Sequence, residues 1–362
     1  LIDRDAEIKT VEALIDTYHF QLDPREKVQN LSVGLCQQVE ILKMLYRNVN
    51  ILILDEPTSV LTPQEVDVLI QKLKDLRDAG KTIIVITHKL REVMALSDSV
   101  TVIKQGRVVG DVKTSETNER ALAQMMVGRD VVLTVQNDGA CTCGGTPAYS
   151  VKGLCAVNET GKQVLHDISF DVCKEEILGI AGVEGNGQSE LVKALSGLLT
   201  VTGGTVTLGG QDCTNAWPDE LRRKGLGIIP EDRYAQGLCT DMSIAENCVA
   251  GYCETVSCFG EFQKRKVNAC RDTYLQKYDI RVAEAEGNVS QLSGGNAQKI
   301  IVARELENSP QVMIACQPTR GVDIGSIEFI HSQLLKFRNA GNAVLLISSE
   351  LSEVLSLSDR VV

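Results

Sequence analysis

The sequence lacks the features of a membrane-spanning or secreted protein. Its wholly apolar runs, such as Ile51–Leu54, span a handful of residues, whereas a membrane-spanning helix needs about 20. The stretch Leu1–Lys9 is charged throughout and does not resemble a signal peptide. With 43% hydrophobic and 23% charged residues, the composition is that of a soluble globular protein.

An excess of positive charge is also lacking. The chain has 37 Lys and Arg against 48 Asp and Glu, for a net charge of −11, so we expect no nucleic-acid partner. The cysteines Cys141 and Cys143, like Cys248, Cys253 and Cys258, do not have zinc-site spacing, and the four histidines do not cluster. We interpret the twelve cysteines as reduced, tolerated thiols of a cytosolic protein.

What the sequence does contain is an internal repeat. Leu31–Gly34 matches Leu292–Gly295 at an offset of 261 positions. The same offset pairs four further dipeptides without a gap: Pro57-Thr58, Ala79-Gly80, Glu92-Val93 and Ser97-Asp98 recur as Pro318-Thr319, Ala340-Gly341, Glu353-Val354 and Ser358-Asp359. A constant register over this distance indicates two copies of one domain.

The repeat also predicts the domain bounds. We expect the later part of a first copy at 1–131, a linker at 132–148 and a second copy at 149–362. Since the second copy begins near Tyr149, the first should begin well before Leu1, and the second should continue past Val362. The sequence therefore predicts a fragment cut at both ends.

The hydrophobic pattern predicts an α/β fold with a central parallel sheet. Four apolar runs are typical of buried parallel strands: Ile51–Leu54, Thr82–Thr87, Val312–Cys316 and Ala343–Ser348. Helical spacing runs from Val66 to Leu76 and from Ile327 to Phe337. Alternation in Ile168–Val172 predicts an antiparallel sheet with one solvated face.

Two adjacent carboxylates, Asp55 and Glu56, follow the first of these strands. Ligands of α/β proteins bind at the carboxyl ends of strands. The pair is suited to holding Mg²⁺ through Asp55 and to orienting water against a phosphate through Glu56. A solvated acidic turn is the alternative.

The segment Gly182–Ser189 has the spacing of a phosphate-binding loop between a strand and a helix predicted to run through Leu198. Its glycines allow backbone N–H groups to wrap phosphates. Gln188 stands where lysine is expected, so a donor is kept and a positive charge is lost. A plain glycine-rich turn is the alternative.

Leu292–Gln298 is a small-residue turn before a helix predicted at Lys299–Glu307. The Ser293 hydroxyl and the Gly295 amide are candidate donors to an anion. Alone, the segment is also compatible with a simple helix cap.

Together these motifs resemble the ATP-binding-cassette (ABC) ATPases. The chain shows a signature at Leu292–Gln298, with a variant at Leu31–Gln37, Walker B at Ile51–Glu56, a switch histidine at Thr87-His88 and Walker A at Gly182–Ser189. Two cassettes in one chain look like the ATPase subunit of the simple-sugar importer group. Three segments most resemble its nucleoside-import branch: Gly182–Leu191, Pro230–Arg233 and Gln317–Asp323. Sugar-type members more often keep an acidic pair at the position of Cys316-Gln317.

The resemblance implies two tandem P-loop NTPase domains, each with a parallel sheet core, an antiparallel β subdomain and a helical subdomain. It implies ATP and Mg²⁺ as cofactors, and pairing of the cassettes so that each ATP lies between one cassette's Walker motifs and the other's signature. The implied partners are membrane permease subunits and, through them, an extracytoplasmic solute-binding protein. The implied location is the cytoplasmic face of the cell membrane.

Comparing the copies position by position predicts two unequal sites. Cys316, Gln317 and Ser349 stand opposite Asp55, Glu56 and His88. The resemblance implies a competent site with Asp55 on the metal and Glu56 and His88 as catalytic residues, completed by Ser293, Gly294, Gly295 and Gln298. It implies an impaired site with Gly182, Gly185, Asn186, Gly187, Gln188 and Ser189, the last also on the metal, completed by Ser32 and Gly34. Because the first P-loop is absent, we expect little ATPase activity from the chain alone.

Glu231 lies at the Q-loop position, which in this family links the nucleotide to the membrane partner; a charged surface loop is the alternative.

Two other functions of the whole protein are possible alternatives. A soluble tandem cassette acting on ribosomes or nucleic acid is disfavoured by the short, weakly charged linker and the net charge of −11. A regulatory nucleotide-binding module without turnover is disfavoured by Asp55-Glu56 together with His88.

Overall fold

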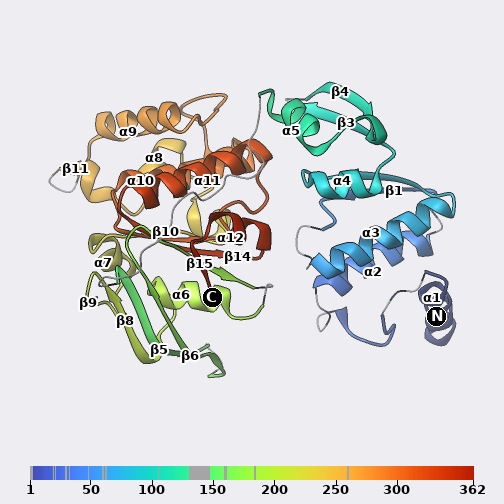
Figure 1. Ribbon diagram of the computed structural model, residues 1–362, viewed down its shortest axis with the longest axis horizontal. Helices are drawn as coiled ribbons and strands as arrows, with labels where there is room; N and C mark the ends of the chain where they lie inside the picture. Colours follow the sequence, from blue (N-terminus) through green and yellow to red (C-terminus); the bar gives the residue numbers. More distant parts are fainter. Residues whose placement is uncertain are drawn as a thin grey trace. The chain divides into compact units, whose positions relative to one another are not determined.

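The computed structural model describes residues 3–18, 20, 22–28, 31, 33–47, 49–58, 61, 63–104, 106–129, 147–158, 161–182, 185–258 and 261–362, with the backbone alone at 33, 34 and 63. The chain divides into two compact units, Leu1–Val131 and Val132–Val362 (Figure 1). Most of the predicted linker, together with Ser32, Cys141 and Cys143, lies outside the described residues. Ala148, at the predicted linker's end, is buried, and its amide donates to the Val172 carbonyl.

The first unit combines helices with two small sheets. Its elements are α1 (Arg4–Tyr18), α2 (Val33–Tyr46), β1 (Ile51–Asp55), α3 (Pro63–Asp78), β2 (Thr82–Ile86), α4 (Leu90–Leu96), β3 (Ser99–Lys104), β4 (Arg107–Lys113), η2 (Thr114–Glu116) and α5 (Glu119–Val127). Strands β1 and β2 pair in parallel, and β3 and β4 form an antiparallel hairpin. The core of the unit gathers Leu52 and Leu54 of β1 with Leu69 and Leu73 of α3.

The second unit contains the larger sheets. Its strands are β5 (Tyr149–Val157), β6 (Gln163–Val172), β7 (Ile177–Ala181), β8 (Val201–Leu208), β9 (Gln211–Asp212), β10 (Leu226–Ile229), β11 (Ser257–Cys258), β12 (Glu261–Phe262), β13 (Val312–Cys316), β14 (Ala343–Ser348) and β15 (Arg360–Val361). Its helices are α6 (Gln188–Leu195), α7 (Pro218–Arg223), η3 (Arg233–Gly237), α8 (Ile244–Val249), η4 (Cys253–Val256), α9 (Lys264–Lys277), η5 (Val289–Gln291), α10 (Gly294–Glu307), α11 (Ile324–Asn339) and α12 (Leu351–Leu357).

A five-stranded sheet in the order β10-β13-β14-β7-β15 lies at the centre of this unit, and all its pairs are parallel. On one face, Val312 and Ile314 pack in a core shared with α6 and the antiparallel sheet β6-β5-β8-β9. On the other face, Met313 and Ala315 pack with α10 and α11. Because both faces of the sheet are covered, β13 is a continuous apolar run. The parallel sheet with its helices, and the antiparallel sheet beside it, confirm the predicted α/β architecture.

The repeat seen in the sequence recurs in the elements. Five of them reappear 261 positions later: α2, β1, α3 and α4 correspond to α10, β13, α11 and α12 with the same bounds, and β2 corresponds to β14, which is one residue longer. The central sheet of the second unit places β13 between β10 and β14, and β14 between β13 and β7. Within the described residues of the first unit, β1 and β2 have only each other as partners.

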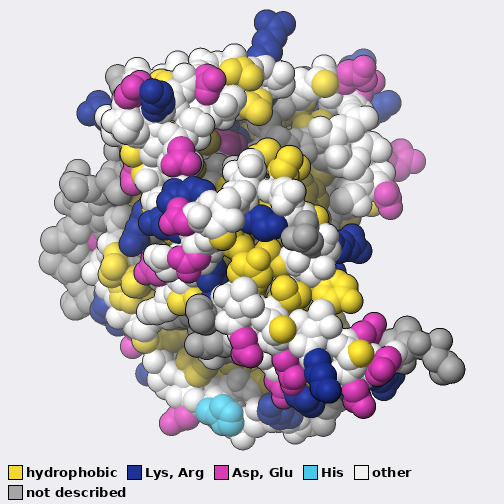
Figure 2. Space-filling model, turned by 90° about the vertical axis from the view of Figure 1, so that its right-hand side faces the viewer, with side chains coloured by type: hydrophobic (Ala, Val, Ile, Leu, Met, Phe, Trp, Pro, Cys, Tyr) yellow, Lys and Arg dark blue, Asp and Glu magenta, His cyan; other side chains and the backbone are white. Residues whose placement is uncertain are grey.

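One prediction about these strands is wrong in the first unit. We expected Ile51–Leu54 to be fully buried, but the burial alternates along β1, and Ile51 and Ile53 are 59% and 62% exposed. Ile84 and Ile86 of β2 are also about half exposed. The physical reason is that the described part of this unit packs only one face of β1–β2. Figure 2 shows exposed hydrophobic side chains gathered among charged ones on one face of the molecule.

Two helix bounds also differ from the prediction. Helix α10 begins at Gly294 rather than at Lys299, because Ser293 caps it and accepts a hydrogen bond from the Asn296 amide. Helix α6 ends at Leu195 rather than at Leu198, because Gly197 turns the chain with φ of +76°. Across the described residues, no helix is both long and apolar enough to cross a membrane.

We predict that Gly204→Ala destabilises the second unit far more than Gly210→Ala. Both glycines have φ near +80 to +90°, but a Cβ at Gly204 would lie 2.4 Å from the Gly153 carbonyl oxygen, whereas at Gly210 it would meet open space. The backbone strain of Gly210→Ala should cost about 1 kcal/mol and the added clash at Gly204 about 2 kcal/mol more. Urea unfolding followed by circular dichroism measures both; equal losses would contradict the close approach of β5 and β8.

Candidate functional site

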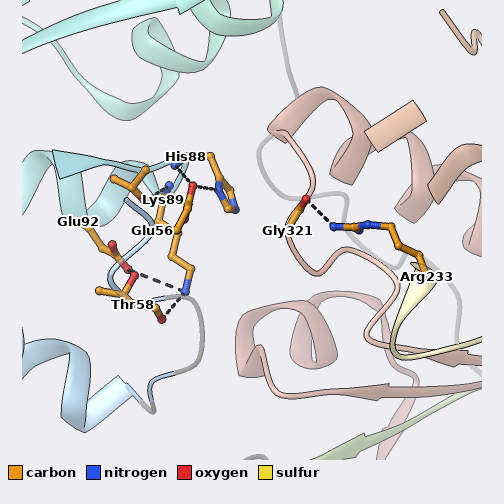
Figure 3. Close-up of polar contacts among 8 residues, drawn as sticks. Glu56, Thr58, His88, Lys89, Glu92, Arg233 and Gly321 are labelled. Carbon is orange, nitrogen blue, oxygen red and sulfur yellow. Dashed lines mark hydrogen bonds and ion pairs between the residues drawn. The ribbon is translucent and has the colours of Figure 1, made fainter. Parts of the chain in front are cut away.

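The turn after β1 brings two predicted catalytic side chains together. The Glu56 amide donates to the Ile86 carbonyl at 2.8 Å, and Glu56 adopts φ of +45°. Its Oε1 lies 2.7 Å from Nδ1 of His88 and accepts from the His88 amide at 3.2 Å (Figure 3). Because a carboxylate only accepts, Nδ1 carries the proton, and Nε2 is left as an acceptor while the ring is neutral.

The electrostatics of this pair favour an ionised Glu56. Burial raises its pKa, but the hydrogen bonds and positive charge of His88, with the charge of Lys89, outweigh burial and hold the pKa below its ordinary value. The second carboxylate oxygen, Oε2, is buried and has no hydrogen-bond partner among the described residues. An ionised carboxylate with one unused acceptor fits the predicted role of orienting a water molecule.

A second layer of polar residues supports this turn. The hydroxyl of Thr58 donates to Oε1 of Glu92 at 2.6 Å, and both residues are buried. Lys89 lies 3.9 Å from Glu92 and donates to the Thr58 carbonyl (Figure 3). Burial raises the pKa of Glu92, although the hydrogen bond from Thr58 and the charge of Lys89 oppose the change. This network fixes the backbone that follows Glu56.

The second unit repeats the geometry of the turn without its charges. Gln317 has φ of +47°, and its amide donates to the Ile347 carbonyl at 2.8 Å. Its Oε1 accepts from the amide and the hydroxyl of Ser349 at 3.3 and 3.1 Å. Thr319 donates to the buried Glu353 as Thr58 does to Glu92. A carboxamide in this position cannot act as a general base.

The strand-end position at which Asp55 was expected to hold a metal also differs between the units. Asp55 ends β1 and is exposed. Cys316 ends β13 and is 1% exposed, and burial raises the pKa of its thiol to about 12. The first position therefore offers a charged oxygen ligand and the second a neutral thiol.

The glycine-rich loop follows β7 at the edge of the sheet where β13 and β14 also end. Gly185 and Gly187 have φ of +89° and +98°. The Gln188 side chain folds back over the loop, where its Oε1 accepts from the Asn186 amide at 3.2 Å. A Cβ at Gly182 would lie 2.1 Å from Nε2 of Gln188, so only glycine leaves room for this arrangement.

The Ser189 hydroxyl, at the start of α6, donates to Oε2 of Glu231 at 2.5 Å. The open glycine backbone, the start of an eight-residue helix and a hydroxyl oxygen fit a nucleotide phosphate with its Mg²⁺. Ser189 would contribute to holding the metal, and the loop amides would bind phosphate oxygens.

The signature turn is a helix start in the second unit. Ser293 caps α10, and Gly295 has no space for a side chain because Ser326 and Asp323 lie against it. Gln298 is 1% exposed, so its side chain is enclosed within this unit. Of the matching positions in the first unit, Ser32 lies outside the described residues and Gly34 is in α2.

Sequence reasoning missed residues that connect these motifs. Arg233 donates to the carbonyls of Arg320 and Gly321 at 2.7 and 3.0 Å and so ties the segment after β10 to the loop after β13 (Figure 3). His331 lies 2.8 Å from the buried Glu353. The recurrence of Thr58 and Glu92 as Thr319 and Glu353 was visible in the repeat, but nothing in the sequence showed that they touch.

Comparisons with known proteins agree with this arrangement. A family model described as ABC transporter matches residues 3–59 and 165–320. The nucleoside import ATP-binding protein NupA of Lactococcus lactis is 41% identical over 98% of this chain and 70% of its own length. The guanosine import ATP-binding protein NupO of Bacillus subtilis is 42% identical over 99% and 71%. The ribose import ATP-binding protein RbsA of Yersinia pestis is 35% identical over 100% and 70%.

Solved structures show the same fold. A nucleotide-free ATP-binding cassette from an ABC transporter superposes with a TM-score of 0.51 at 22% identity, over 60% of this chain and 87% of that one. The parallel sheet and its glycine-rich loop thus define a P-loop ATPase fold. The chain belongs to the ABC transporter family. It is an ATPase subunit of an ABC-type translocase, which confirms the predicted family and enzyme class.

We predict that His88→Ala raises the pKa of Glu56. The substitution removes the hydrogen bond and the charge that hold this pKa down, while the effect of burial remains. Carboxyl NMR titration of the wild type and the variant measures the change. Ser349→Ala, which disrupts the uncharged counterpart in the other unit, is the control and should leave Glu56 unaffected; an unchanged Glu56 pKa in His88→Ala would contradict the assigned contact.

Proposed function

We propose that the chain is part of the ATP-hydrolysing subunit of a bacterial importer that carries nucleosides or simple sugars through a separate membrane permease. Support comes from the relatives, since two named for nucleoside and guanosine import are 41% and 42% identical to this chain, against 35% for the ribose protein. Permease subunits and an extracytoplasmic solute-binding protein are the partners in this proposal. Its location is the cytoplasmic face of the membrane.

We propose further that the chain holds two unequal cassettes, at 1–131 and 149–362. The contrast between Glu56–His88 and Gln317–Ser349 carries this proposal. The same hydrogen-bonded turn occurs in both units, but only the turn of the first unit contains a carboxylate that can act as a general base. Glu56 accepts a hydrogen bond from the attacking water, and His88 keeps the carboxylate oriented and ionised. Mg²⁺ would be held by Asp55 in this cassette and would offset charge on the phosphates.

In the second cassette, the proposed role is nucleotide binding with little turnover. The loop at Gly182–Ser189 keeps its backbone donors and its hydroxyl, whereas Gln188, Cys316 and Gln317 remove a cation, a metal ligand and the base. The pairing of the cassettes through their signature turns, which the family resemblance implies, belongs to this proposal as well.

A P-loop preceding Leu1 completes the first cassette in this proposal. The half-exposed isoleucines of β1 and β2 support it, because the equivalent strands of the second unit are buried between β10 and β7. The relatives support it too, because the chain spans about 70% of their length.

The partner is tested by affinity capture of the complete two-cassette protein from detergent-solubilised membranes. Recovery with an integral membrane permease would support the importer. Recovery with ribosomes and no permease would favour a soluble tandem-cassette ATPase instead.

We predict that Glu56→Gln lowers the ATPase rate of the complete protein by roughly 10²- to 10⁴-fold, since it removes the only proposed general base. Gln317→Glu should leave the rate within a few-fold of the wild type, because the buried Cys316 beside it offers no charged metal ligand. Steady-state phosphate release measures both rates. Loss of activity in Gln317→Glu alone would refute the assignment.

A further inference from the structure

An arginine after β10 holds the loop that follows β13. Nη1 of Arg233 donates to the Arg320 carbonyl at 2.7 Å, and Nη2 donates to the Gly321 carbonyl at 3.0 Å (Figure 3). The guanidinium also lies over the Tyr234 ring, with Cζ 5.5 Å from the ring centroid. Both terminal nitrogens of Arg233 therefore bind one short stretch of backbone, which a rigid planar fork can do and a single ammonium group cannot.

The signature turn lies against the same loop. A Cβ at Gly294, the first residue of α10, would lie 3.0 Å from the Gly321 carbonyl oxygen and 3.2 Å from Nη2 of Arg233. A Cβ at Gly295 would lie 2.6 Å from Oδ2 of Asp323, the residue that caps α11. Because the two glycines pack directly on the loop, the position of the loop sets the position of the turn.

The sequence of the first unit lacks the glycines that this packing needs. At the offset of 261 positions, Val33 and Val60 correspond to Gly294 and Gly321. A valine side chain at either position of the second unit would occupy space that Arg233 takes there. The pair of glycines is therefore present only in the copy whose signature turn lies against an arginine-held loop.

We propose that Arg233 is a positioning residue for ATP hydrolysis. It holds the loop Arg320–Asp323, and the loop holds the amides of the signature turn where they can donate to a nucleotide phosphate. The inference rests on the proposed function, in which this turn completes the nucleotide site that contains Glu56. Arg233 acts through the loop and not on the nucleotide, since both of its terminal nitrogens already bind carbonyl oxygens.

Placement matters at this turn because its donors are backbone amides. The first amides of a helix have no partner within the helix and are available to an anion. Gly294 and Gly295 lie at this helix start, and glycine has the widest range of backbone conformations of any residue. Without a support, the turn would sample several orientations, and a displacement of about 1 Å can lower a reaction rate by about 10²-fold.

The first measurement is steady-state phosphate release by the complete two-cassette protein over a range of ATP concentrations. Arg233→Ala should lower kcat by about 10- to 100-fold. KM should change less, because in the proposed function the glycine-rich loop and Mg²⁺ of each site bind the phosphates without this turn. Arg233→Lys should stay well below the wild type, since one ammonium group cannot donate to both carbonyls as the fork does.

Chemical rescue distinguishes positioning from a general loss of stability. Ethylguanidinium at millimolar concentration can enter the space left by Arg233→Ala and donate to the same two carbonyls, so it should restore much of the lost kcat. Arg265→Ala is the matched control, because Arg265 is exposed on α9, and it should keep the wild-type kcat with or without ethylguanidinium. Circular dichroism verifies each fold, and Arg233→Lys carries the test if Arg233→Ala does not fold.

A second substitution tests the path through the loop. Gly321→Ala places a methyl group 3.0 Å from Nη2 of Arg233 and so disturbs the same contact from the other side. Alone it should lower kcat. In the double variant with Arg233→Ala the methyl group meets no guanidinium, while the backbone strain at φ of +59° is unchanged. The double variant should therefore lose less than the product of the two single losses.

Hydrogen exchange of the complete protein provides a readout that needs no turnover. The amides of Arg320 and Val322 form turn hydrogen bonds to the carbonyls of Gln317 and Thr319. These amides should exchange faster in Arg233→Ala, because the loop has lost its support. Their exchange should match the wild type in the exposed-arginine control.

The outcomes separate this inference from the function on which it rests. An unchanged rate in Glu56→Gln would refute the proposed function. A normal kcat in Arg233→Ala beside an inactive Glu56→Gln would overturn the positioning role alone. Wild-type activity in Arg233→Lys would overturn the need for two donors. A low kcat with unchanged loop exchange, or fully multiplicative losses in the double variant, would show that Arg233 does not act through the loop and would overturn the inference as well.

Discussion

Both units depend on one backbone hydrogen bond at the end of a strand. The amide of the first residue after the strand donates to a carbonyl of the adjacent parallel strand at 2.8 Å, from Glu56 to Ile86 and from Gln317 to Ile347. The residue is thereby held at positive φ, which costs a non-glycine residue about 1–3 kcal/mol. Its side chain then reaches the turn after the neighbouring strand. There Glu56 hydrogen-bonds His88 in the first unit, and Gln317 hydrogen-bonds Ser349 in the second.

The same geometry is kept while its charges differ. A buried threonine–glutamate pair supports the turn in both units, but the other neighbour of the glutamate differs. In the first unit Lys89 lies 3.9 Å from Glu92, and in the second unit the position of Lys89 is taken by Glu350. His331, on α11, lies 2.8 Å from Glu353 instead. A buried carboxylate needs a partner, and each unit supplies one from a different element.

Much of the fold followed from the sequence, because periodicity and the repeat are properties of the chain itself. Strands β13 and β14 have the predicted bounds. The predicted parallel arrangement is also present, in the pair β1–β2 that precedes Glu56 and in the pair β13–β14 that precedes Gln317. The exposure of Ile51 and Ile53 could not be predicted, because burial depends on what covers the second face of a strand. Helix α10 began earlier than expected because the Ser293 cap outweighs the weak helix propensity of two glycines.

The site was predicted less completely, for a physical reason. Motifs identify residues that are close in sequence, so Asp55, Glu56 and the loop at Gly182–Ser189 were found. Contacts such as Ser189 with Glu231, or Arg233 with Arg320, join residues more than 40 positions apart and depend on the order of strands in the sheet. The sequence assigned Glu231 to the Q-loop position, but only the structure shows that Glu231 follows β10 and that its side chain lies beside the loop at Ser189.

These observations separate the scaffold of the site from its chemistry. The turn at Gln317 keeps a strained backbone and two hydrogen bonds from Ser349, although no base is present to be positioned there. The neighbouring loop likewise has glycines at positive φ, and in the proposed function Gln188 stands where a lysine is expected. In the proposed function, a scaffold of this kind would still place amides and oxygens around a phosphate. In the proposed function, binding needs those groups and hydrolysis also needs an ionised base, so Gln317 would remove turnover and leave the binding geometry in place.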